Sequence, residues 1–249
     1  MDCEIEAGKR WVSQYGDFYA RQHVIILGDD LFSRQPFIQA LKDKKLHFIL
    51  VCKPDSHVVL YEMVDFMAAN RVLGVHQKRV WNGNYGEIYT YHYANQLPLR
   101  GDQEAISVNW CEITITREDT GEQLYKNAWI TDFEVTQTTV EAIVRDGRAR
   151  WKIENENNNV LKTKGYHLEH NFGHGDQYLA SLLLSLNLLA FLFHTVLDLV
   201  DEKYHLIRQA LRKRQKFFQH IEALLCYIQF TNWDELFAFM CKGLELNTS

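Results

Sequence analysis

The first quarter of the chain alternates short apolar runs with amphipathic stretches. Residues 24–27 (Val-Ile-Ile-Leu) and 47–52 (His-Phe-Ile-Leu-Val-Cys) are apolar runs of strand length, which favours buried strands. Residues 36–44, between them, begin with proline and keep their apolar side chains on one side of a helix. A strand, a helix and a strand at this spacing predict a βαβ unit with two parallel strands. A further helix is expected over residues 4–19.

The pattern changes to a period of two between residues 78 and 133. Three β-rich runs, 87–93, 105–116 and 125–132, are separated by glycine-containing turns. We expect a meander of antiparallel strands inserted between two parts of an α/β core. Residues 127–133 are expected to return to the core sheet.

From residue 136 to the end the pattern is helical. Residues 179–200 are apolar almost all round, whereas 203–216 are basic and 217–244 are amphipathic. An apolar run of about 20 residues is long enough to cross a membrane, but polar side chains such as Ser185 and Asp198 interrupt this one. We therefore expect a helix buried in the centre of a soluble domain, with a membrane helix as the alternative.

The composition is that of a folded cytosolic protein. Of 249 residues, 47% are hydrophobic and only 3 are proline, so long disordered stretches are not expected. The 5 cysteines are scattered and odd in number, which indicates reduced thiols. The N-terminus is charged and lacks the apolar run of a secretory signal. The net charge of -5 does not exclude DNA as a partner, because binding depends on local patches.

The first candidate for chemistry is an acidic pair at the end of the first strand. Asp29 and Asp30 follow Gly28 directly, and ligands of α/β folds bind just beyond the carboxyl ends of the strands. The two carboxylates point different ways, so only one is expected to face a site. The alternative is a turn or a helix cap, where aspartate is also favoured.

The second candidate is the polar helical run over residues 147–165. Arg150 and Glu154 are four residues apart and share a helix face, and Lys162 lies roughly 80° from Glu154 by helix geometry. Glu156 points elsewhere. A carboxylate between two cations can hold a divalent metal while the cations hold phosphates. A solvated helix with ion pairs along its face is the alternative.

This helical run is similar to a family signature. Bacterial insertion-sequence DDE transposases that carry a β-strand insertion domain have Tyr, two residues, Arg, three residues, Glu, six residues and Lys. The chain resembles this pattern at Arg150, Glu154 and Lys162. Residues 24–30 with 48–53 resemble the segment that holds the second catalytic Asp of the family. The resemblance covers most of the chain.

The resemblance implies an α/β fold with a ribonuclease-H-like core, interrupted by a β-rich insertion and closed by C-terminal helices. The expected organisation has four parts along the chain. They are residues 1–77 (first part of the core), 78–126 (insertion), 127–175 (second part of the core with the catalytic helix) and 176–249 (C-terminal helical region).

The resemblance also implies an activity, which is DNA transposition by strand cleavage and strand transfer. Asp29 and Glu154 would be catalytic acids and ligands of Mg²⁺, with Mn²⁺ as a substitute; Asp30 and Glu156 are the alternatives. In this family three carboxylates hold two metal ions, which activate the nucleophile and stabilise the leaving oxygen.

The basic residues of the run are expected to contact DNA. The residues concerned are Arg150, Lys152 and Lys162. The implied partners are transposon-end and target DNA and a second copy of the chain in a synaptic complex, with no membrane. The implied location is the bacterial cytoplasm, in association with the nucleoid.

Three departures from the family pattern affect these expectations. Gly147 stands where the pattern has Tyr. Lys162 is one residue too far from Glu154, and Leu161 occupies the expected place, which indicates a one-residue insertion or a local π-bulge. No strand ending in the family's first catalytic Asp precedes Asp29. We therefore expect a truncated chain, or one reading frame of a broken element, that holds metals weakly. An inactive remnant that only binds DNA is the alternative.

Three other groups of residues have two interpretations each. Three histidines within eight residues invite a zinc site, but glycines among them interrupt the helix, which favours packing or a DNA-facing role. These are His167, His170 and His174. The basic stretch over 203–216 either follows a DNA backbone or forms a solvated helix face. Aromatic residues between 81 and 93 either stack on bases or pack in a sheet, and their period of two favours packing.

Overall fold

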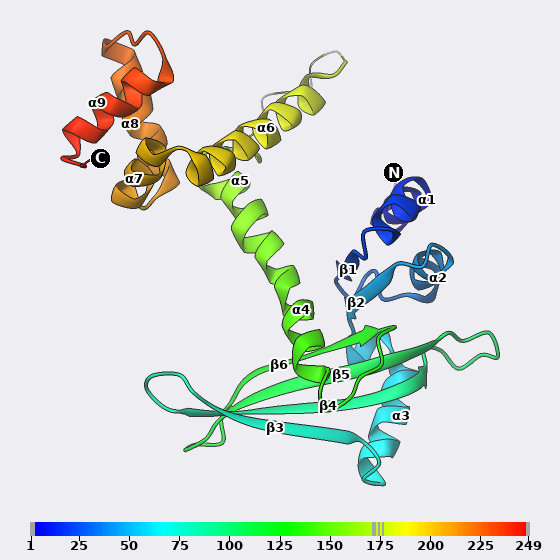
Figure 1. Cartoon of the computed structure of the whole chain (residues 1–249). Helices are drawn as coiled ribbons and strands as arrows, with labels where there is room; N and C mark the ends of the chain where they lie inside the picture. Colours follow the sequence, from blue (N-terminus) through cyan, green and yellow to red (C-terminus); the bar gives the residue numbers. More distant parts are fainter. Residues whose placement is uncertain (1–2, 171–172, 174, 176, 248–249) are drawn as a thin grey trace. The chain divides into compact units, whose positions relative to one another are not determined.

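The computed structural model describes residues 3–170, 173, 175 and 177–247. It is a mixed α/β protein built around one six-stranded mixed sheet (Figure 1). The chain divides into two units, Met1–Arg150 (unit 1) and Trp151–Ser249 (unit 2), each of which is described by itself. The boundary falls within the segment 127–175.

Unit 1 contains the sheet and the helices that cover it. The β-strands are β1 (Ile25–Gly28), β2 (His47–Val51), β3 (Gly74–Trp81), β4 (Gly86–Pro98), β5 (Ser107–Arg117) and β6 (Gln123–Thr131). The helices are α1 (Glu4–Ala20), α2 (Gln35–Asp43), the 3₁₀ turn η1 (Pro54–Ser56), α3 (Val58–Ala69) and α4 (Val140–Lys152), whose last two residues belong to unit 2. The sequence pattern therefore located α1, α2 and five of these strands, but it missed α3.

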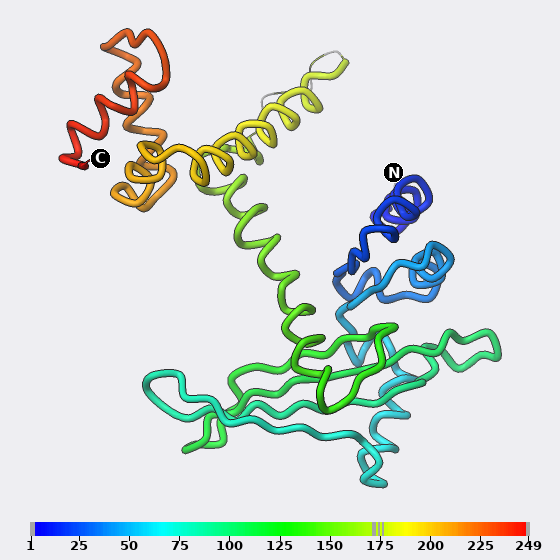
Figure 2. The backbone as a smooth tube through the Cα atoms, in the orientation of Figure 1, coloured from blue at the N-terminus to red at the C-terminus, as the bar shows by residue number. Residues whose placement is uncertain are grey.

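The strand order is β1-β2-β6-β5-β4-β3, with β1 and β2 parallel and every later neighbour antiparallel. The predicted βαβ unit is thus confirmed. The predicted return of residues 127–133 to the core sheet is also confirmed, because Ile130 of β6 is paired with Leu50 of β2. The residue-78 boundary of the expected insertion lies inside β3, and the meander is continuous with β1 and β2. Figure 2 shows the long β3–β4 hairpin turning at one end of this sheet.

Alternation along β2 explains why helices cover both faces of the sheet. Phe48 and Leu50 pack with α1, α2 and α3 on one face, whereas Ile49 and Val51 pack with α4 on the other. Each of these four side chains is buried. A strand that is apolar at every position is what a sheet covered on both faces requires.

Unit 2 consists of helices around a core of its own. They are the π-helix η2 (Ile153–Asn158), α5 (Asn159–Thr163), α6 (Leu179–Val200), α7 (Glu202–Leu211), α8 (Arg214–Tyr227) and α9 (Trp233–Gly243). Tyr204, Phe217 and Phe237 from α7, α8 and α9 meet in its core. Asp201 caps α7 by accepting a hydrogen bond from the N–H of Tyr204 at 2.7 Å.

The expectation that residues 179–200 form a buried central helix is wrong. α6 contains no buried residue, and Leu199 is 80% exposed. It is 22 residues long and its most apolar 18-residue window has a mean hydropathy of 1.9, so by length and composition it could cross a membrane. The periodicity could not distinguish these cases, because an apolar helix is equally compatible with a protein core, a partner surface or a bilayer.

Candidate functional site

The first part of the candidate site is the loop that follows β1. Asp29 lies at its start and is half-buried. Its Oδ1 accepts a hydrogen bond from the backbone N–H of Leu31 at 3.0 Å, and within the described parts of the chain this is the only hydrogen bond of the carboxylate. Its second carboxylate oxygen can therefore accept a ligand, and a carboxylate oxygen is a ligand that Mg²⁺ prefers.

Asp30 has a structural role in the same loop. Its Oδ1 accepts from the backbone N–H of Lys53 at 2.8 Å, and its Oδ2 accepts a very short hydrogen bond from the hydroxyl of Ser56. Both partners follow β2, so this carboxylate ties together the loops at the ends of the two parallel strands. The structure thus separates two acids that the sequence left as alternatives, because only Asp29 keeps a carboxylate oxygen without a hydrogen bond among the described residues.

A buried polar pair lies beside Asp30. The hydroxyl of Ser33 is 2.6 Å from Nε2 of His57, and both residues are buried. The same Nε2 faces Asp30 Oδ1 at 3.8 Å, so the carboxylate does not orient the far side of the ring as a catalytic triad requires. Burial and the nearby Arg34 charge lower the pKa of His57, although Asp30 opposes this shift. These groups therefore form a satisfied buried cluster, not a nucleophilic site.

The second part of the candidate site is a continuous helical backbone from Val140 to Thr163. Close packing explains why glycine occupies position 147. A Cβ at this position would lie 2.8 Å from Nε1 of Trp129 and 3.0 Å from Cγ2 of Ile49. The helix therefore approaches β2 and β6 so closely that only glycine fits.

The π-bulge expected between Glu154 and Lys162 is present. Residues Ile153–Asn158 form a π-helix between α4 and α5, where i→i+5 winding accommodates an additional residue. Glu154 lies in this segment and is exposed. Nζ of Lys162 pairs with Glu169 Oε1 at 3.0 Å, with both side chains largely exposed. A surface pair of this kind contributes only about 0–1 kcal/mol, so a phosphate could displace it.

The other residues of the predicted run lie on the same helical backbone. Arg150 is half-buried near the end of α4, and Lys152 is exposed at its last position. Glu156, the alternative acid, is also exposed within the π-helix. Exposure alone does not separate Glu154 from Glu156, so that choice stays a prediction.

The two candidate acids belong to different units. Asp29 lies in unit 1 and Glu154 in unit 2. Their convergence on one metal therefore stays a prediction. Within the residues that the structure describes, no group of three or more His, Cys, Asp and Glu side chains is placed to hold a metal ion.

The histidine group and the cysteines offer no further chemistry here. His174 lies outside the described residues, and His167 has a positive φ of 53°, which interrupts a helix at that point. All five cysteines are free, as expected. Burial raises the pKa of Cys111 to about 12 and raises that of Cys52 further, so neither buried thiol is a nucleophile.

The aromatic residues of the meander pack in the sheet, as their spacing favoured. Tyr91 is buried against the face that α4 covers, and Tyr89 and Tyr93 pack beside it. Trp81, by contrast, is 62% exposed. Base stacking by the alternating tyrosines is not compatible with their positions in this core.

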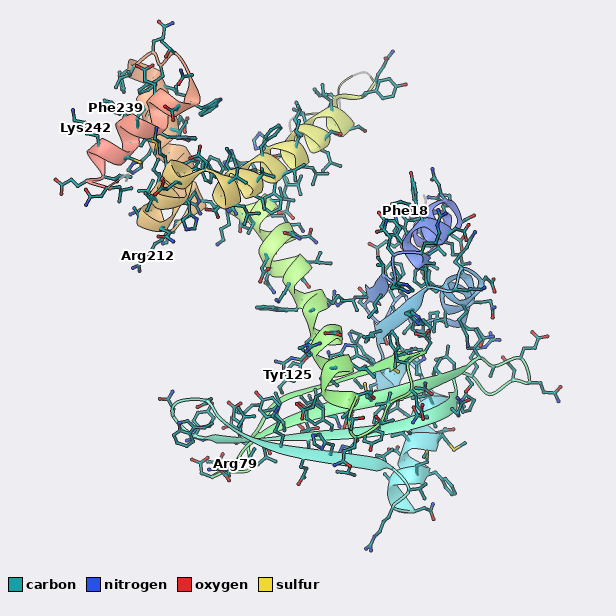
Figure 3. All side chains as sticks on the ribbon, viewed as in Figure 1. Phe18, Arg79, Tyr125, Arg212, Phe239 and Lys242 are labelled. Atoms are coloured by element: carbon teal, nitrogen blue, oxygen red, sulfur yellow. The ribbon has the colours of Figure 1, made fainter. Side chains whose placement is uncertain are left out.

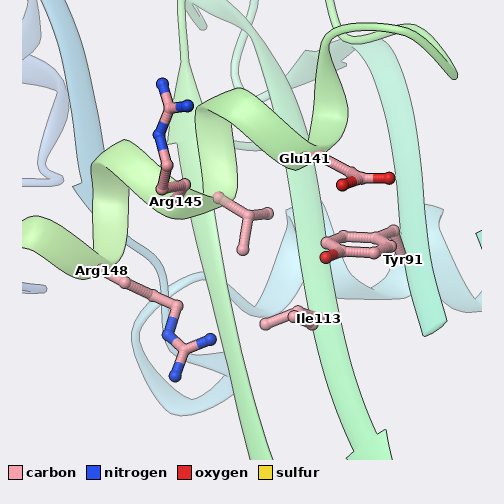
Figure 4. A pocket seen from close by; sticks show the side chains of 6 residues that line it. Tyr91, Ile113, Glu141, Arg145 and Arg148 are labelled. Carbon is pink, nitrogen blue, oxygen red and sulfur yellow. The ribbon is translucent and has the colours of Figure 1, made fainter. Parts of the chain in front are cut away.

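A hollow that the sequence did not indicate lies between α4 and the sheet (Figure 4). It has a volume of about 170 Å³. Glu141 and Arg148 line it from α4, and Tyr91 and Ile113 line it from the strands. Glu141 is already paired with Lys78 at 2.7 Å and with His76 at 2.9 Å. The hollow is too small for a drug-sized ligand and its carboxylate is neutralised, so we assign it no function.

The basic stretch over residues 203–216 divides into two groups in the structure. Arg212, Lys213 and Lys216 are exposed, whereas Arg208 and Arg214 are half-buried beside aromatic rings. Helical spacing alone could not find the second group, because it depends on how α6, α7 and α8 pack.

Neither a scan against protein-family models nor a search of curated proteins finds a match for this chain.

Proposed function

We propose that this chain carries the catalytic region of a DDE transposase, with a ribonuclease-H-like core and a β-strand insertion. The reaction would be DNA transposition by metal-dependent strand cleavage and strand transfer. The observation that carries the proposal is the π-helix at residues 153–158. Between Glu154 and Lys162 the chain has one residue more than the transposase signature. A π-helix accommodates one additional residue in a helix, so it accounts for this difference.

The surroundings of Asp29 fit the role of a metal ligand. The carboxylate follows a parallel strand of a covered sheet and leaves one oxygen without a hydrogen bond among the described residues. Asp30, its alternative, is committed to Lys53 and Ser56. Asp29 and Glu154 would each offer oxygen ligands to Mg²⁺ or Mn²⁺, which supply Lewis-acid activation of the attacking and leaving oxygens.

The basic side chains would position the DNA. Lys162 lies eight residues after Glu154 and forms an exposed pair with Glu169. Arg150 and Lys152 precede Glu154 on the same helical backbone. Cations on both sides of a metal-binding carboxylate would hold the phosphates that flank the scissile bond. The proposal includes a second copy of the chain in a synaptic complex and a cytoplasmic location.

Metal binding tests the assignment of the acids without knowledge of the DNA sequence. Mn²⁺ bound to the full chain would be counted by electron paramagnetic resonance for the natural protein and for Asp29→Asn and Glu154→Gln. Each substitution is expected to weaken binding about tenfold or more, as loss of a charged ligand does. Glu156→Gln and Asp30→Asn are the matched controls. Equal loss in Glu156→Gln and Glu154→Gln would overturn the choice of Glu154.

DNA cleavage tests the activity. Nicking of supercoiled plasmid would be followed with Mn²⁺ and with Mg²⁺, and donor-end DNA would be added where its sequence is known. Metal-dependent nicking that Asp29→Asn abolishes supports the transposase. Retained DNA binding without cleavage supports the inactive remnant.

One observation favours a second candidate function, a membrane-anchored protein. α6 is long and apolar enough to span a bilayer, and no part of its most apolar window is buried. Expression followed by fractionation separates the two. Recovery in the soluble fraction without detergent would remove the membrane candidate, and extraction only with detergent would support it.

A further inference from the structure

Two arginines of unit 2 lie close enough for their charges to act on each other. Arg208 on α7 and Arg214 on α8 are both half-buried, and neither has a carboxylate within 4 Å among the residues that the structure covers. Nη1 of Arg208 is buried and makes no hydrogen bond. Asp198 is the nearest acid to act on Arg208, but its carboxylate is paired with His205 at 3.1 Å.

Aromatic rings fix both guanidinium groups. Cζ of Arg208 lies 5.5 Å from the ring centroid of Phe217, and Cζ of Arg214 lies 5.6 Å from that of Phe191. Contacts of this type hold a cation in place while leaving its N–H groups free for another partner. The arginines are thus positioned before any ligand arrives, which lowers the entropy lost on binding.

Tyr166 also contacts Arg214. Nη1 of Arg214 donates to the Tyr166 hydroxyl at 3.2 Å, and this hydroxyl is 2.7 Å from Nδ1 of His194. Because arginine can only donate, the tyrosine hydroxyl can donate its own proton to His194. The imidazole is then neutral, and burial and the two arginine charges lower the pKa of His194 to about 4. The two arginine charges therefore act on each other, and no carboxylate lies within 4 Å of either one among the described residues.

The backbone is adapted to this arrangement. Gly165 has a φ of 103°, and a Cβ there would collide with the ring of Phe218, so glycine is needed to bring Tyr166 into the cluster. Arg212, in the turn between α7 and α8, points away from the helices (Figure 3). The half-buried Arg208 and Arg214 thus differ from the exposed cations of residues 203–216.

We propose that Arg208 and Arg214, with Tyr166 as a positioning residue, form a binding site for a phosphate group. Paired like charges in a half-buried apolar setting are unfavourable, and an oxyanion bound between them would relieve the repulsion. The planar guanidinium matches the oxygens of phosphate and can donate two parallel hydrogen bonds. The phosphate belongs either to a nucleic-acid backbone or to a small phosphate compound. The site shares no residue with the acids of the proposed transposase and does not depend on them.

Thermal unfolding of the full chain in sodium phosphate and in sodium chloride, at equal ionic strength, tests the site. Phosphate is expected to raise the unfolding midpoint of unit 2 in the natural protein and in the control Lys216→Gln, whose side chain is exposed on α8. Arg208→Gln and Arg214→Gln are expected to lose this increment, with phosphate affinity about tenfold weaker or more, as loss of a charge-assisted hydrogen bond implies.

Sodium chloride distinguishes a binding role from a structural one. Without phosphate, Arg208→Gln is expected to unfold no earlier than the natural protein, because it removes one of two repelling charges. The proposal is contradicted if Arg208→Gln lowers the unfolding midpoint equally in both salts. It is also contradicted if phosphate raises the midpoint of every protein by the same amount, or of no protein. Tyr166→Phe keeps the ring and removes the hydroxyl that holds Arg214, so it is expected to reduce the phosphate increment in a folded protein.

Fluorescence anisotropy of a labelled oligonucleotide identifies the source of the phosphate. Weaker binding by Arg208→Gln than by Lys216→Gln would assign the site to a nucleic-acid backbone. Equal binding by these two variants, with the phosphate increment still lost in Arg208→Gln, would assign it to a small phosphate compound. If Asp29→Asn and Glu154→Gln bind Mn²⁺ as well as the natural protein does, the transposase proposal fails. The phosphate site at Arg208 and Arg214, with either source of phosphate, is not affected by that result.

Discussion

At the scale of single residues, two residues of the same type make different contacts because their neighbours in the fold differ. Asp29 and Asp30 are adjacent in sequence, but only Asp30 is tied into the loop after β2. Arg208 and Arg212 are four residues apart, but only Arg208 turns toward aromatic rings. Substitutions at such positions should therefore separate local structure from ligand binding.

Substitution by alanine is expected to change stability in opposite directions at two helical glycines, Gly147 and Gly243. Gly147→Ala is expected to destabilise the protein by about 1–3 kcal/mol, because the added methyl group would overlap Trp129 and Ile49. Gly243→Ala, in α9, has no atom within 4 Å of the added group and is expected to stabilise by about 0.5–1 kcal/mol. Urea unfolding measures both changes. Equal effects in the two variants would contradict the close approach of α4 to the sheet.

His194 predicts a loss of stability in mild acid. Its pKa is lowered from 6.5 to about 4, chiefly by burial and also by the charges of Arg214 and Arg208. As the pH falls below 6.5 the unfolded chain takes up a proton that the folded chain does not, so unit 2 loses stability progressively between about pH 6.5 and 4. His194→Gln, which can still accept from Tyr166, is expected to flatten this dependence. Unfolding midpoints measured across the range would check it.

At the scale of elements, the helical stretch from α4 to α5 is interrupted by a π-helix at residues 153–158. A π-turn is rare and is frequently found at functional sites, because its i→i+5 winding is less favourable than that of an α-helix. Residues 153–158 are polar apart from Ile153, and none of their side chains is buried. Packing therefore does not explain why this turn is present.

Deletion of Asn157 tests whether the π-turn serves a ligand. Removing one residue should let α4 continue into α5 as a regular helix, which is expected to preserve or raise the thermal midpoint. Mn²⁺ affinity should nevertheless fall, since the deletion removes the π-winding in which Glu154 lies and so redirects its carboxylate. Asn157→Ala keeps the length and is expected to bind Mn²⁺ like the natural protein. Unchanged Mn²⁺ binding after the deletion would show that the turn has no part in the site.

At the scale of the whole molecule, the two units have separate apolar cores. Leu50 and Trp110 are buried in unit 1, and Tyr204 and Phe217 are buried in unit 2. Each core lies wholly within the residues of its own unit. Separate cores are the physical basis for separate unfolding.

Calorimetry is expected to resolve two transitions in the full chain. Leu50→Ala should lower one midpoint and Phe217→Ala the other, each by the equivalent of about 3 kcal/mol, as expected for a cavity in a packed core. The unaffected transition in each variant is the control for the other. A single transition that both variants shift equally would mean that the units unfold together.

The local pattern of the sequence by itself determined most of the elements. Apolar runs predicted β1 and β2, alternation predicted β4 to β6, and helical spacing predicted the C-terminal helices. The resemblance to the transposase signature gave a one-residue insertion or a π-bulge near Glu154 as alternatives, and the structure has a π-helix at residues 153–158. These features depend on neighbours within a few residues.

Only the tertiary structure decided how these elements combine. It placed the meander and β1–β2 in one sheet, committed Asp30 rather than Asp29 to the loop, left α6 exposed, and brought Arg208 and Arg214 together around Tyr166. Periodicity reports which face of an element is apolar, but it does not report what covers that face. Pairing between distant segments depends on contacts that no local window contains, and the electrostatic state of each charged group depends on that pairing.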